Sequence, residues 1–480
     1  TLDQLDLPTS LHSLILSRID QLSEHQKSTL KVASVIGRLF QAAWLWGMYP
    51  DLGEPQQIKA DLEALHRLEF APMDKPDPEL TYIFKHVVTR EVAYESLPYA
   101  MRAILHDQFG QFIEQKYGDR LDRYVDLLAF HYYRCENQVK KREYLRKAGE
   151  AAQEDYNNGA AIDYYQRLLP LLPPGEQVAI MLKLGEVLQL VGQWHKAGQL
   201  YQKALNLAEQ LNNRSALAWS QTAMGEVLRK QGLYVEAMNW FEQARTTFEA
   251  LGDKAGVGQV LHYSGNLAAE QGDYVTSRQR YEASLAIRRA LNDKANIASL
   301  LSNLGLDAHQ LGDYQTAFNL YQESLELRYQ LGDQWAIAVS LNNLGYLALD
   351  QGDYEAAQTR LEVAVNLQRQ VGDRSMLADA LNNLGNVARD RGDYSMAQQL
   401  YQEGLLINRE LGKKWGVAYL LEDIGGLAAR QGQAERALRL SGAAETLREL
   451  IGFPLPPAEQ AKLDRILEPA RRTLGEEAAI

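Results

Sequence analysis

Apolar residues recur along most of this chain at the spacing of an amphipathic helix. Leu341, Leu344 and Ala348 fall on one helical face, and Ala357 and Leu361 share a face of the segment that follows. Polar residues fill the positions between them. Nearly the same pattern returns 40 residues later. The pattern therefore predicts pairs of amphipathic helices that are repeated along the sequence.

Two series of glycines give this pattern a fixed period. The first glycine recurs every 40 residues, and a second glycine follows each one seven residues later. Seven regular copies predict an internal structural repeat. The first series is Gly185, Gly225, Gly265, Gly305, Gly345, Gly385 and Gly425, and the second is Gly192, Gly232, Gly272, Gly312, Gly352, Gly392 and Gly432.

The second glycine is expected to mark a turn between two helices. In four copies it begins the sequence Gly-Asp-Tyr, as at Gly272, Asp273 and Tyr274. Glycine adopts the left-handed backbone that ends many helices, and aspartate caps the start of the next one. Each repeat is therefore predicted to be a helical hairpin. Because one hairpin cannot bury both of its apolar faces, the hairpins must stack, and the chain is predicted to be an all-α solenoid.

The repeat resembles the tetratricopeptide repeat (TPR). That family places an alanine twelve residues after the first glycine and a bulky residue four further on, as Ala317 and Tyr321 follow Gly305. The resemblance runs from Tyr144 to Gly452 and implies a right-handed superhelical solenoid. The period of 40 residues exceeds the usual ~34. It is similar to that of the long-repeat subgroup that includes kinesin light chain.

We expect four regions along the chain. Residues 1–118 do not repeat and are predicted to form a small helical, winged-helix-like domain. Residues 119–175 are predicted to be a helical linker with a degenerate TPR, and residues 176–452 hold the seven regular repeats. A proline-rich break follows. Residues 453–480 are expected to form a capping helix and tail.

The N-terminal region combines helices with a short strand. Its sequences LPTSLHSLILSRIDQL, ASVIGRLF and FKHVVTREVAYESL resemble the segment that follows the nucleotide-binding core of STAND signalling ATPases. The resemblance implies a winged helix and gives His86 a place comparable to a histidine that contacts the phosphates of bound ADP. Alternatively, His86 only caps or packs at this junction. No GxxxxGK[ST] motif occurs, so ATP or ADP is expected only with an upstream ATPase domain, which would be an intramolecular partner.

The most apolar stretch, residues 32–50, is interrupted by Arg38, Gln41 and Gly47. A membrane span of this length would carry few or no charged residues. We therefore predict a buried core helix over residues 32–50, and no membrane partner.

Paired asparagines mark a candidate binding surface. Asn303, Asn343 and Asn383 stand two residues before the first glycine in three consecutive repeats. In the resembling family this position approaches a concave groove, where an amide can donate to and accept from the backbone of an extended peptide. Alternatively, the amides bond to neighbouring repeats and hold the stack. The predicted peptide-binding set is Asn303, Asn342, Asn343, Asn382, Asn383, Tyr346, Asn386, Arg389, His309 and Arg430.

Charge and cysteine content narrow the classes of partner. The net charge of −12 disfavours general attraction to nucleic acid, and basic residues of the N-terminal region are interspersed with acids. Direct DNA binding is not expected. A single cysteine, Cys135, excludes an intramolecular disulfide framework and favours the cytoplasm.

Sequence motifs of catalysis are missing. The chain has no HExxH, no metal-ligand spacing and no G-x-S-x-G elbow. We therefore expect no enzyme activity, no metal and no cofactor of its own. The favoured function is a non-catalytic sensor or scaffold arm of a STAND-type ATPase or transcriptional regulator, which binds a protein or extended peptide. The alternatives are the regulatory region of a multidomain enzyme, such as a nucleotide cyclase or kinase, and a constitutive assembly scaffold.

Overall fold

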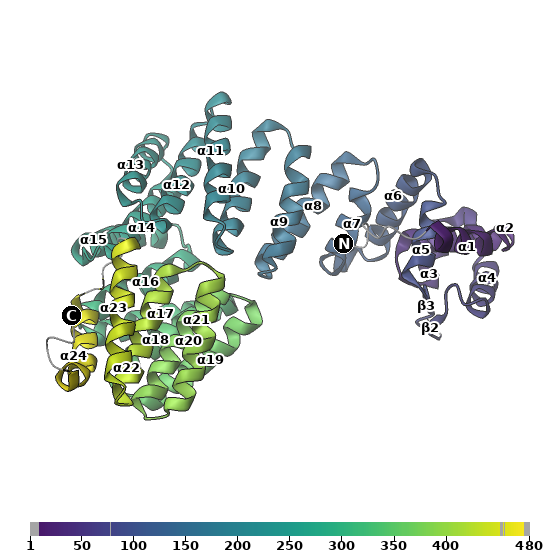
Figure 1. Cartoon of the computed structure of the whole chain (residues 1–480). Coiled ribbons are helices and arrows are strands. Elements are labelled where there is room, and N and C mark those ends of the chain that lie inside the picture. Colours follow the sequence, from purple (N-terminus) through teal and green to yellow (C-terminus); the bar gives the residue numbers. More distant parts are fainter. Residues whose placement is uncertain (1–8, 77, 452–454, 456, 475–480) are drawn as a thin grey trace. The chain divides into compact units, whose positions relative to one another are not determined.

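A computed structural model describes residues 9–76, 78–451, 455 and 457–474. The chain divides into two compact units (Figure 1). The N-terminal unit comprises the described residues up to Ala151 together with Asp163–Leu172, and the repeat unit comprises Ala152–Ile162 and the described residues from Pro173 onward.

The N-terminal unit is mainly helical and contains one small sheet. Its three strands form an antiparallel sheet in the order β1-β3-β2, in which Tyr82 of β3 lies opposite both Phe40 and Met73. The elements are α1 (Thr9–Asp20), α2 (Glu24–Ile36), β1 (Leu39–Gln41), α3 (Ala42–Met48), η2 (Pro50–Leu52), α4 (Pro55–Arg67), β2 (Met73–Lys75), β3 (Thr81–Ile83), α5 (Val87–Glu95), α6 (Tyr99–Lys116), η3 (Gly118–Tyr124), α7 (Val125–Tyr133), α8 (Gln138–Glu154), α9 (Asn158–Leu168) and η4 (Leu169–Leu171).

The prediction of one buried helix over residues 32–50 is wrong. Helix α2 ends at Ile36, the chain forms β1, and α3 begins at Ala42. The break occurs at Gly37, whose φ of 155° and ψ of −173° lie in a region that is essentially restricted to glycine. Hydrophobicity correctly indicated burial here, since Ile36, Phe40 and Ala42 are buried. It could not indicate which hydrogen-bond pattern the buried backbone adopts.

The N-terminal unit extends beyond the expected boundary at residue 118. Helices α6 and α7 pack together, and a Cβ atom at Gly110 would lie 2.6 Å from the ring of Tyr132. Helix α8 joins the same apolar core through Tyr144, whose ring stacks on that of Tyr132 with centroids 5.2 Å apart. The first part of the expected linker is therefore part of a compact core.

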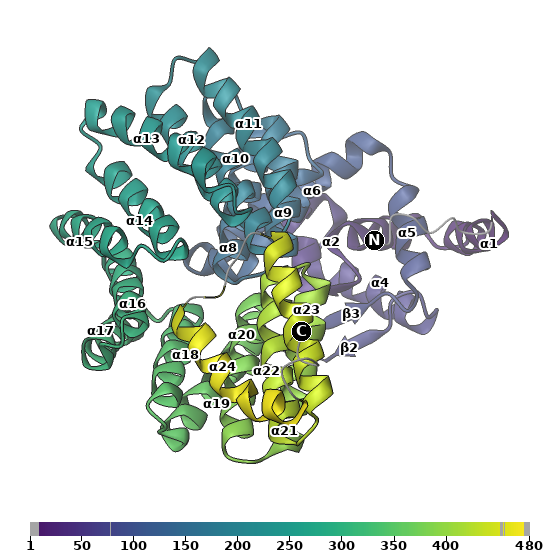
Figure 2. The same ribbon diagram turned by 60° about the vertical axis from the view of Figure 1, so that its left-hand side comes forward.

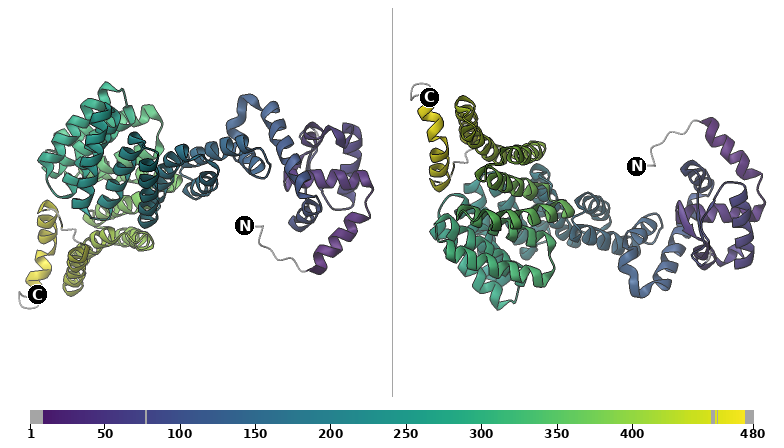
Figure 3. Two further views of the ribbon diagram at one scale, coloured as in Figure 1. Left: turned by 90° about the horizontal axis from the view of Figure 1, so that it is seen from above. Right: turned by 90° about the horizontal axis from the view of Figure 1, so that it is seen from below.

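The repeat unit contains seven consecutive helical hairpins. Figure 3 shows these hairpins following one another along a curved path, and each second helix packs against the first helix of the next hairpin. The all-α solenoid fold predicted from the sequence is confirmed. The pairs are α10 (Pro174–Leu190) with α11 (Trp194–Gln210), α12 (Arg214–Lys230) with α13 (Tyr234–Leu251), α14 (Lys254–Glu270) with α15 (Tyr274–Ala290), α16 (Lys294–Gln310) with α17 (Tyr314–Leu331), α18 (Gln334–Asp350) with α19 (Tyr354–Val371), α20 (Arg374–Asp390) with α21 (Tyr394–Glu410), and α22 (Lys414–Arg430) with α23 (Ala434–Ile451).

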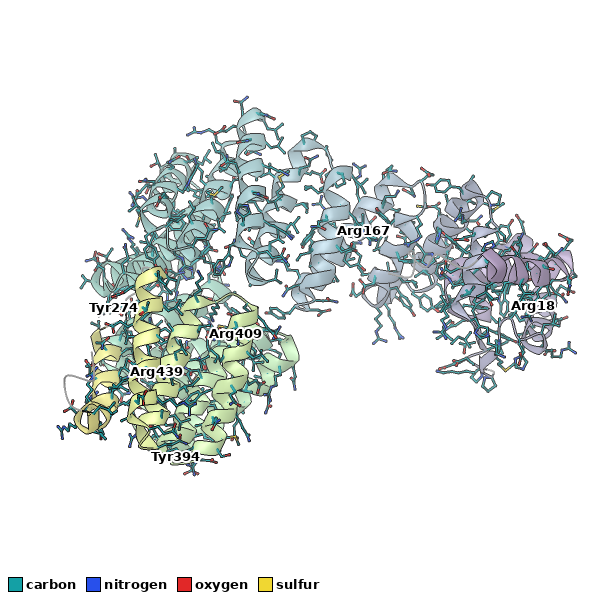
Figure 4. All side chains as sticks on the ribbon, viewed as in Figure 1. Arg18, Arg167, Tyr274, Tyr394, Arg409 and Arg439 are labelled. Carbon is teal, nitrogen blue, oxygen red and sulfur yellow. The ribbon has the colours of Figure 1, made fainter. Side chains whose placement is uncertain are left out.

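The turns have the geometry that their sequence predicts. Gly272 has a φ of 78°, in the left-handed region, and the Asp273 carboxylate accepts a 3.0 Å hydrogen bond from the Thr276 backbone N–H. In the four hairpins with this sequence, the second helix begins at the tyrosine after the aspartate, and Figure 4 labels Tyr274 and Tyr394. An N-cap of this kind contributes about 1 kcal/mol. Repetition of the turn fixes the angle of every hairpin.

The first glycine allows the two helices of a hairpin to approach closely. A Cβ atom at Gly385 would lie 2.5 Å from the ring of Tyr401, sixteen residues later. Gly149 and Tyr165 have the same relation in α8 and α9, at 2.6 Å. Any side chain at these glycines would displace an aromatic ring from a close-packed interior. The degenerate repeat therefore retains the packing of the regular repeats.

One further helix, α24 (Pro457–Leu474), follows the last hairpin. It packs against both α22 and α23. Figure 2 shows it running from α18 toward α22, and hydrogen bonds join its N-terminal end to α18. Helix α24 therefore contacts the first helices of several repeats in addition to the end of the stack.

Candidate functional site

A cavity of about 720 Å³ lies among the first helices of the last three repeats and α24. Its walls come from α18, α20, α22 and α24. We call this space the groove cavity. Six of the ten predicted peptide-binding residues line it, namely Tyr346, Asn382, Asn383, Asn386, Arg389 and Arg430.

The other four predicted residues lie outside the lining of this cavity, on α16 and α18. Asn342 accepts a 3.1 Å hydrogen bond from the amide of Asn383. His309 bonds to Asp350, which does line the cavity, at 2.9 Å. The side chain of Asn343 is partly buried and forms no hydrogen bond with a described residue. Asn303 lies further along the stack, on α16.

Most of the predicted asparagines bridge adjacent repeats. The amide of Asn303 donates to the side-chain oxygen of Asn266 at 2.9 Å and lies 2.9 Å from His262 Nε2. The amides of Asn382 and Asn386 both donate to Asp423 of the next repeat, at 2.8 and 3.3 Å. These bonds match the alternative in which asparagines hold the stack. Binding of a peptide by these residues remains a prediction.

A buried ion pair forms the floor of the groove cavity. The guanidinium of Arg389 donates to Asp423 at 3.1 Å and to Asp390 at 2.9 Å. Burial raises the pKa of Asp423, in opposition to the charge of Arg389 and the amide hydrogen bonds. The aspartate side chains are each 20% exposed, so water screens part of this interaction. The floor is therefore polar.

The sequence did not indicate the side of the groove cavity that the last repeat supplies. Lys413 stands where earlier repeats have a capping aspartate, and its ammonium lies 3.0 Å from Asp379 and 3.9 Å from the ring centroid of Trp415. Glu422 is buried and pairs with Arg448 at 2.6 Å. The sequence alone shows that lysine replaces aspartate at this repeated position. That Lys413 pairs with Asp379 of the preceding repeat could be identified only from the fold.

Two hydrogen-bond acceptors at the groove cavity have no partner among the described residues. They are the side-chain oxygens of Asn382 and Asn408, and Asn408 is 1% exposed. A buried amide oxygen without a donor costs free energy, typically about 1–3 kcal/mol. Both oxygens are enclosed by the protein, so they do not face a molecule in the cavity.

The N-terminal end of α24 completes the opposite wall. Lys462 lies 2.8 Å from Asp350, and the hydroxyl of Tyr346 donates to Glu459 at 2.6 Å. Burial alone would raise the pKa of Asp350, but hydrogen bonds from His309 and Lys462 outweigh it and lower the pKa. The sequence placed α24 at the end of the stack. It gave no indication that these residues reach α18.

His86 lies in the N-terminal unit at the N-cap position of α5. Its side chain is exposed and makes no capping hydrogen bond. A nearby ion pair joins Lys85 and Glu69 at 2.7 Å. The imidazole therefore remains accessible at the junction between β3 and α5.

Within the described part of the chain, no group of three or more His, Cys, Asp or Glu side chains is arranged to hold a metal ion. None of the helices described here has the length and apolar character needed to cross a membrane. The charged residues of the groove form ion pairs, both between repeats, as Arg389 with Asp423, and within one hairpin, as Glu422 with Arg448.

The fold and the groove define an α-solenoid of helical hairpins. A family model described as "Tetratricopeptide repeat" matches residues 177–250, 256–330, 297–370, 336–410 and 376–449. These segments cover more than half of the chain. The protein belongs to the tetratricopeptide repeat family, as its sequence pattern predicted.

Solved structures with a similar fold include three that are 12–14% identical to this chain. One is the Signal Transduction ATPase with Numerous Domains (STAND) protein with a tetratricopeptide repeat sensor from Pyrococcus horikoshii, with a TM-score of 0.52, 14% identity, and coverage of 97% of this chain and 68% of that chain. Another is a Rap protein complexed with Competence and Sporulation Factor, with a TM-score of 0.51, 13% identity, and coverage of 85% and 99%. A third is the Rap conjugation gene regulator of the plasmid pLS20 in complex with the Phr* peptide, with a TM-score of 0.51, 12% identity, and coverage of 66% and 92%. At these identities the likeness shows the fold alone. A comparison with curated proteins gave no sequence match.

Proposed function

We propose that the chain is a non-catalytic sensor or scaffold arm of a STAND-type signalling ATPase or transcriptional regulator, and that it binds a protein or extended peptide in the groove of its repeats. The observation that carries the proposal is the groove cavity. Its lining combines the amide side chains of Asn382, Asn383 and Asn386 with the aromatic rings of Trp415 and Tyr419. Amide oxygens accept from a peptide backbone, and aromatic rings cover its side chains.

The N-terminal unit supports the attachment to an ATPase. Its order of helix, strand, two helices and two strands, with an antiparallel β1-β3-β2 sheet, resembles that of a winged helix and supports this part of the proposal. Similarity to the STAND protein extends over nearly the whole chain and includes this unit. We propose that the unit packs on an intramolecular ATPase domain and that exposed His86 faces its nucleotide. The chain itself has no phosphate-binding loop.

DNA binding is not part of the proposal. Helix α4 has the position of a recognition helix, and its Lys59 and Arg67 are interspersed with Asp61 and Glu63. A phosphate backbone would be attracted to clustered basic residues instead. The single, buried Cys135 supports a cytoplasmic location.

A matched pair of asparagine variants tests the binding role. Asn343→Ala removes an amide that bonds no described residue, whereas Asn303→Ala breaks a bond between repeats. We expect Asn343→Ala to weaken binding of peptides selected on the full chain from a random displayed library, with an unchanged melting temperature. Asn303→Ala should lower the melting temperature by a few degrees, since about 1 kcal/mol is lost.

The control is Gln315→Ala, on the exposed side of α17. It should change neither binding nor melting. Selected peptides that bind all variants equally would show that the groove asparagines serve the stack alone. Failure to select any peptide that competes at the groove would refute the binding role.

A further inference from the structure

Helix α24 presents one continuous face to the groove. Its residues at intervals of three or four positions turn toward the repeats, while Gln460, Glu468 and Arg472 on the other side are exposed. Residues spaced in this way lie on one side of a helix. The residues of α24 that line the groove cavity or pack on the repeats are Glu459, Lys462, Leu463, Arg465, Ile466, Leu467, Pro469 and Ala470.

The N-terminal half of this face is held by charge. Lys462 Nζ lies 2.8 and 2.9 Å from the two oxygens of Asp350, and the side chains are 31% and 12% exposed. Among the described residues, the ion pairs of Asp350 are those with Lys462 and His309. Other groove carboxylates have cations from the repeats, as Asp423 has Arg389. Asp350 therefore obtains its lysine partner from α24.

The C-terminal half of the same face is held by packing. Leu467 and Ala470 are buried in a cluster with Ala428 of α22 and Ala437 of α23. Beside this cluster, Ile466 of α24 lies against Gly426 of α22.

Position 426 is a glycine only in the last repeat. The equivalent residues of the earlier repeats, at intervals of 40, are Glu186, Glu226, Asn266, Leu306, Tyr346 and Asn386. A Cβ atom at Gly426 would lie 3.0 Å from Ile466 of α24. The glycine therefore makes room for Ile466, which indicates that the repeat surface is shaped to receive this helix.

The charge of the groove cavity indicates which other molecule fits. The repeats supply five acidic lining residues, Asp350, Asp379, Asp390, Glu422 and Asp423, and two basic ones, Arg389 and Arg430. Helix α24 adds two further basic residues, Lys462 and Arg465, and one acid, Glu459. Since Asp350 has a buried charge, a molecule that replaces α24 must bring a cation to it.

We propose that α24 is an internal ligand of the groove, and that an external partner displaces it with an amphipathic helix of the same pattern. The partner helix carries a lysine or arginine that pairs with Asp350 and, four residues later, an aliphatic side chain that packs over Gly426. This inference rests on the proposed function, because it assigns the chemistry of the partner and the regulation of the same groove.

A labelled peptide with the sequence of residues 457–474 is the probe. It is titrated into three full chains: wild type, the double variant Lys462→Glu/Ile466→Asp, and the control Arg472→Glu on the exposed side of α24. We expect the double variant to bind the probe at least tenfold more tightly than wild type, because its own α24 no longer occupies the groove. The control should bind like wild type. Equal affinity for all three chains would overturn the proposal.

Charge exchange then tests the contact with Asp350. A probe that carries Lys462→Glu should bind the double variant at least tenfold more weakly than the unmodified probe. Adding Asp350→Lys to the chain should restore its binding. Loss of binding without restoration would show that the ion pair does not determine recognition.

A further measurement uses the wild-type chain in case the double variant fails to fold. Excess unlabelled probe should increase hydrogen exchange in the chain's own α24, and a scrambled peptide of the same composition should not. Unchanged exchange at saturating probe would refute displacement. If the probe displaces α24 but no library peptide competes at the groove, then α24 is an internal ligand and the proposed external binding fails. If library peptides bind wild type and the double variant equally, external binding holds and regulation by α24 fails.

Discussion

The N-terminal unit and the repeat unit bury their apolar residues in different ways. In the N-terminal unit, one continuous cluster includes residues as distant in sequence as Ile15, Phe109 and Tyr144. In the repeat unit, the buried residues divide into separate clusters, such as the one that joins Tyr321 of α17 to Leu344 of α18. The first unit therefore depends on contacts between distant segments. The second depends on contacts between neighbouring hairpins, as expected for a repeat protein.

This difference has consequences for cooperativity. Loss of one contact in a continuous core weakens every element that shares it, whereas loss in one hairpin affects mainly the adjacent hairpins. Three experiments can test this contrast, in order of decreasing expected effect.

The largest effect is expected from Phe109→Ala in the N-terminal unit. Phe109 is fully buried, and its ring lies 5.5 Å from Trp44 and 4.5 Å from His131 between centroids. Removal of a buried phenylalanine costs about 3–5 kcal/mol. Hydrogen exchange should accelerate together in α2, α3, α6 and α7, with little change in α16–α23. A change confined to α6 would contradict a shared core.

The second test is acidification, because the N-terminal unit contains two buried histidines in contact. His106 and His131 approach at 2.9 Å between their Nδ1 atoms, and Tyr94 bonds to His106 at 3.0 Å. Burial lowers the pKa of His106 to about 3 and places that of His131 well below its usual value. As pH falls below about 6.5, the unfolded chain binds protons first. Stability should then fall by about 1.4 kcal/mol per pH unit for each histidine.

The repeat unit contains titrating groups with opposite effects. Burial lowers the pKa of His262 to about 4. The stability that neutral His262 contributes to the fold therefore also falls as pH decreases from about 6.5. Burial raises the pKa of Asp307 to about 6, and this group stabilises the fold below its unfolded pKa of about 3.8 and loses that effect as pH rises through 6. Denaturant titrations at pH 8 to 5.5, with pulse proteolysis to identify the fragments, should show the N-terminal unit to be the more acid-sensitive. An equal loss in both units would contradict this expectation.

The smallest effect is expected from Gly385→Ala in the repeat unit. The new methyl group would meet the ring of Tyr401 at 2.5 Å, and overpacking of this kind costs about 1–3 kcal/mol. Exchange should accelerate in α20 and α21 and in the adjacent hairpins, with little change in the N-terminal unit.

A second helical glycine supplies the matched control. Gly159, in α9, has open space around the position of a Cβ atom. Gly159→Ala should leave stability unchanged or increase it slightly, since alanine has the higher helix propensity. If both substitutions destabilise the chain to the same extent, close packing is not the reason for the glycine at position 385.

The sequence predicted the hairpins well because their determinants are local. The glycine that ends one helix and the aspartate that caps the next lie within two positions, as at Gly272 and Asp273. Family membership followed from the same short-range pattern. The break at Gly37 was missed because hydrophobic residues on both sides fit a buried helix as well as a buried strand.

The candidate site was only partly predictable. Helical spacing identified Asn386 and Arg389, which line the groove cavity, but the partner of each side chain lies on another repeat. Asn343 and Asn383 occupy equivalent positions, yet only Asn383 bonds to a described residue. The same residue at equivalent positions of two repeats therefore does not imply the same contact.

The sequence by itself determined the helical hairpins, their period and the need for stacking, because periodicity and turn chemistry act between residues close along the chain. The tertiary structure alone decided that Lys462 meets Asp350 and that Ile466 lies beside Gly426. These contacts depend on the curvature of the whole stack. Small rotations between successive repeats accumulate to set that curvature. No single segment of the sequence determines the total rotation.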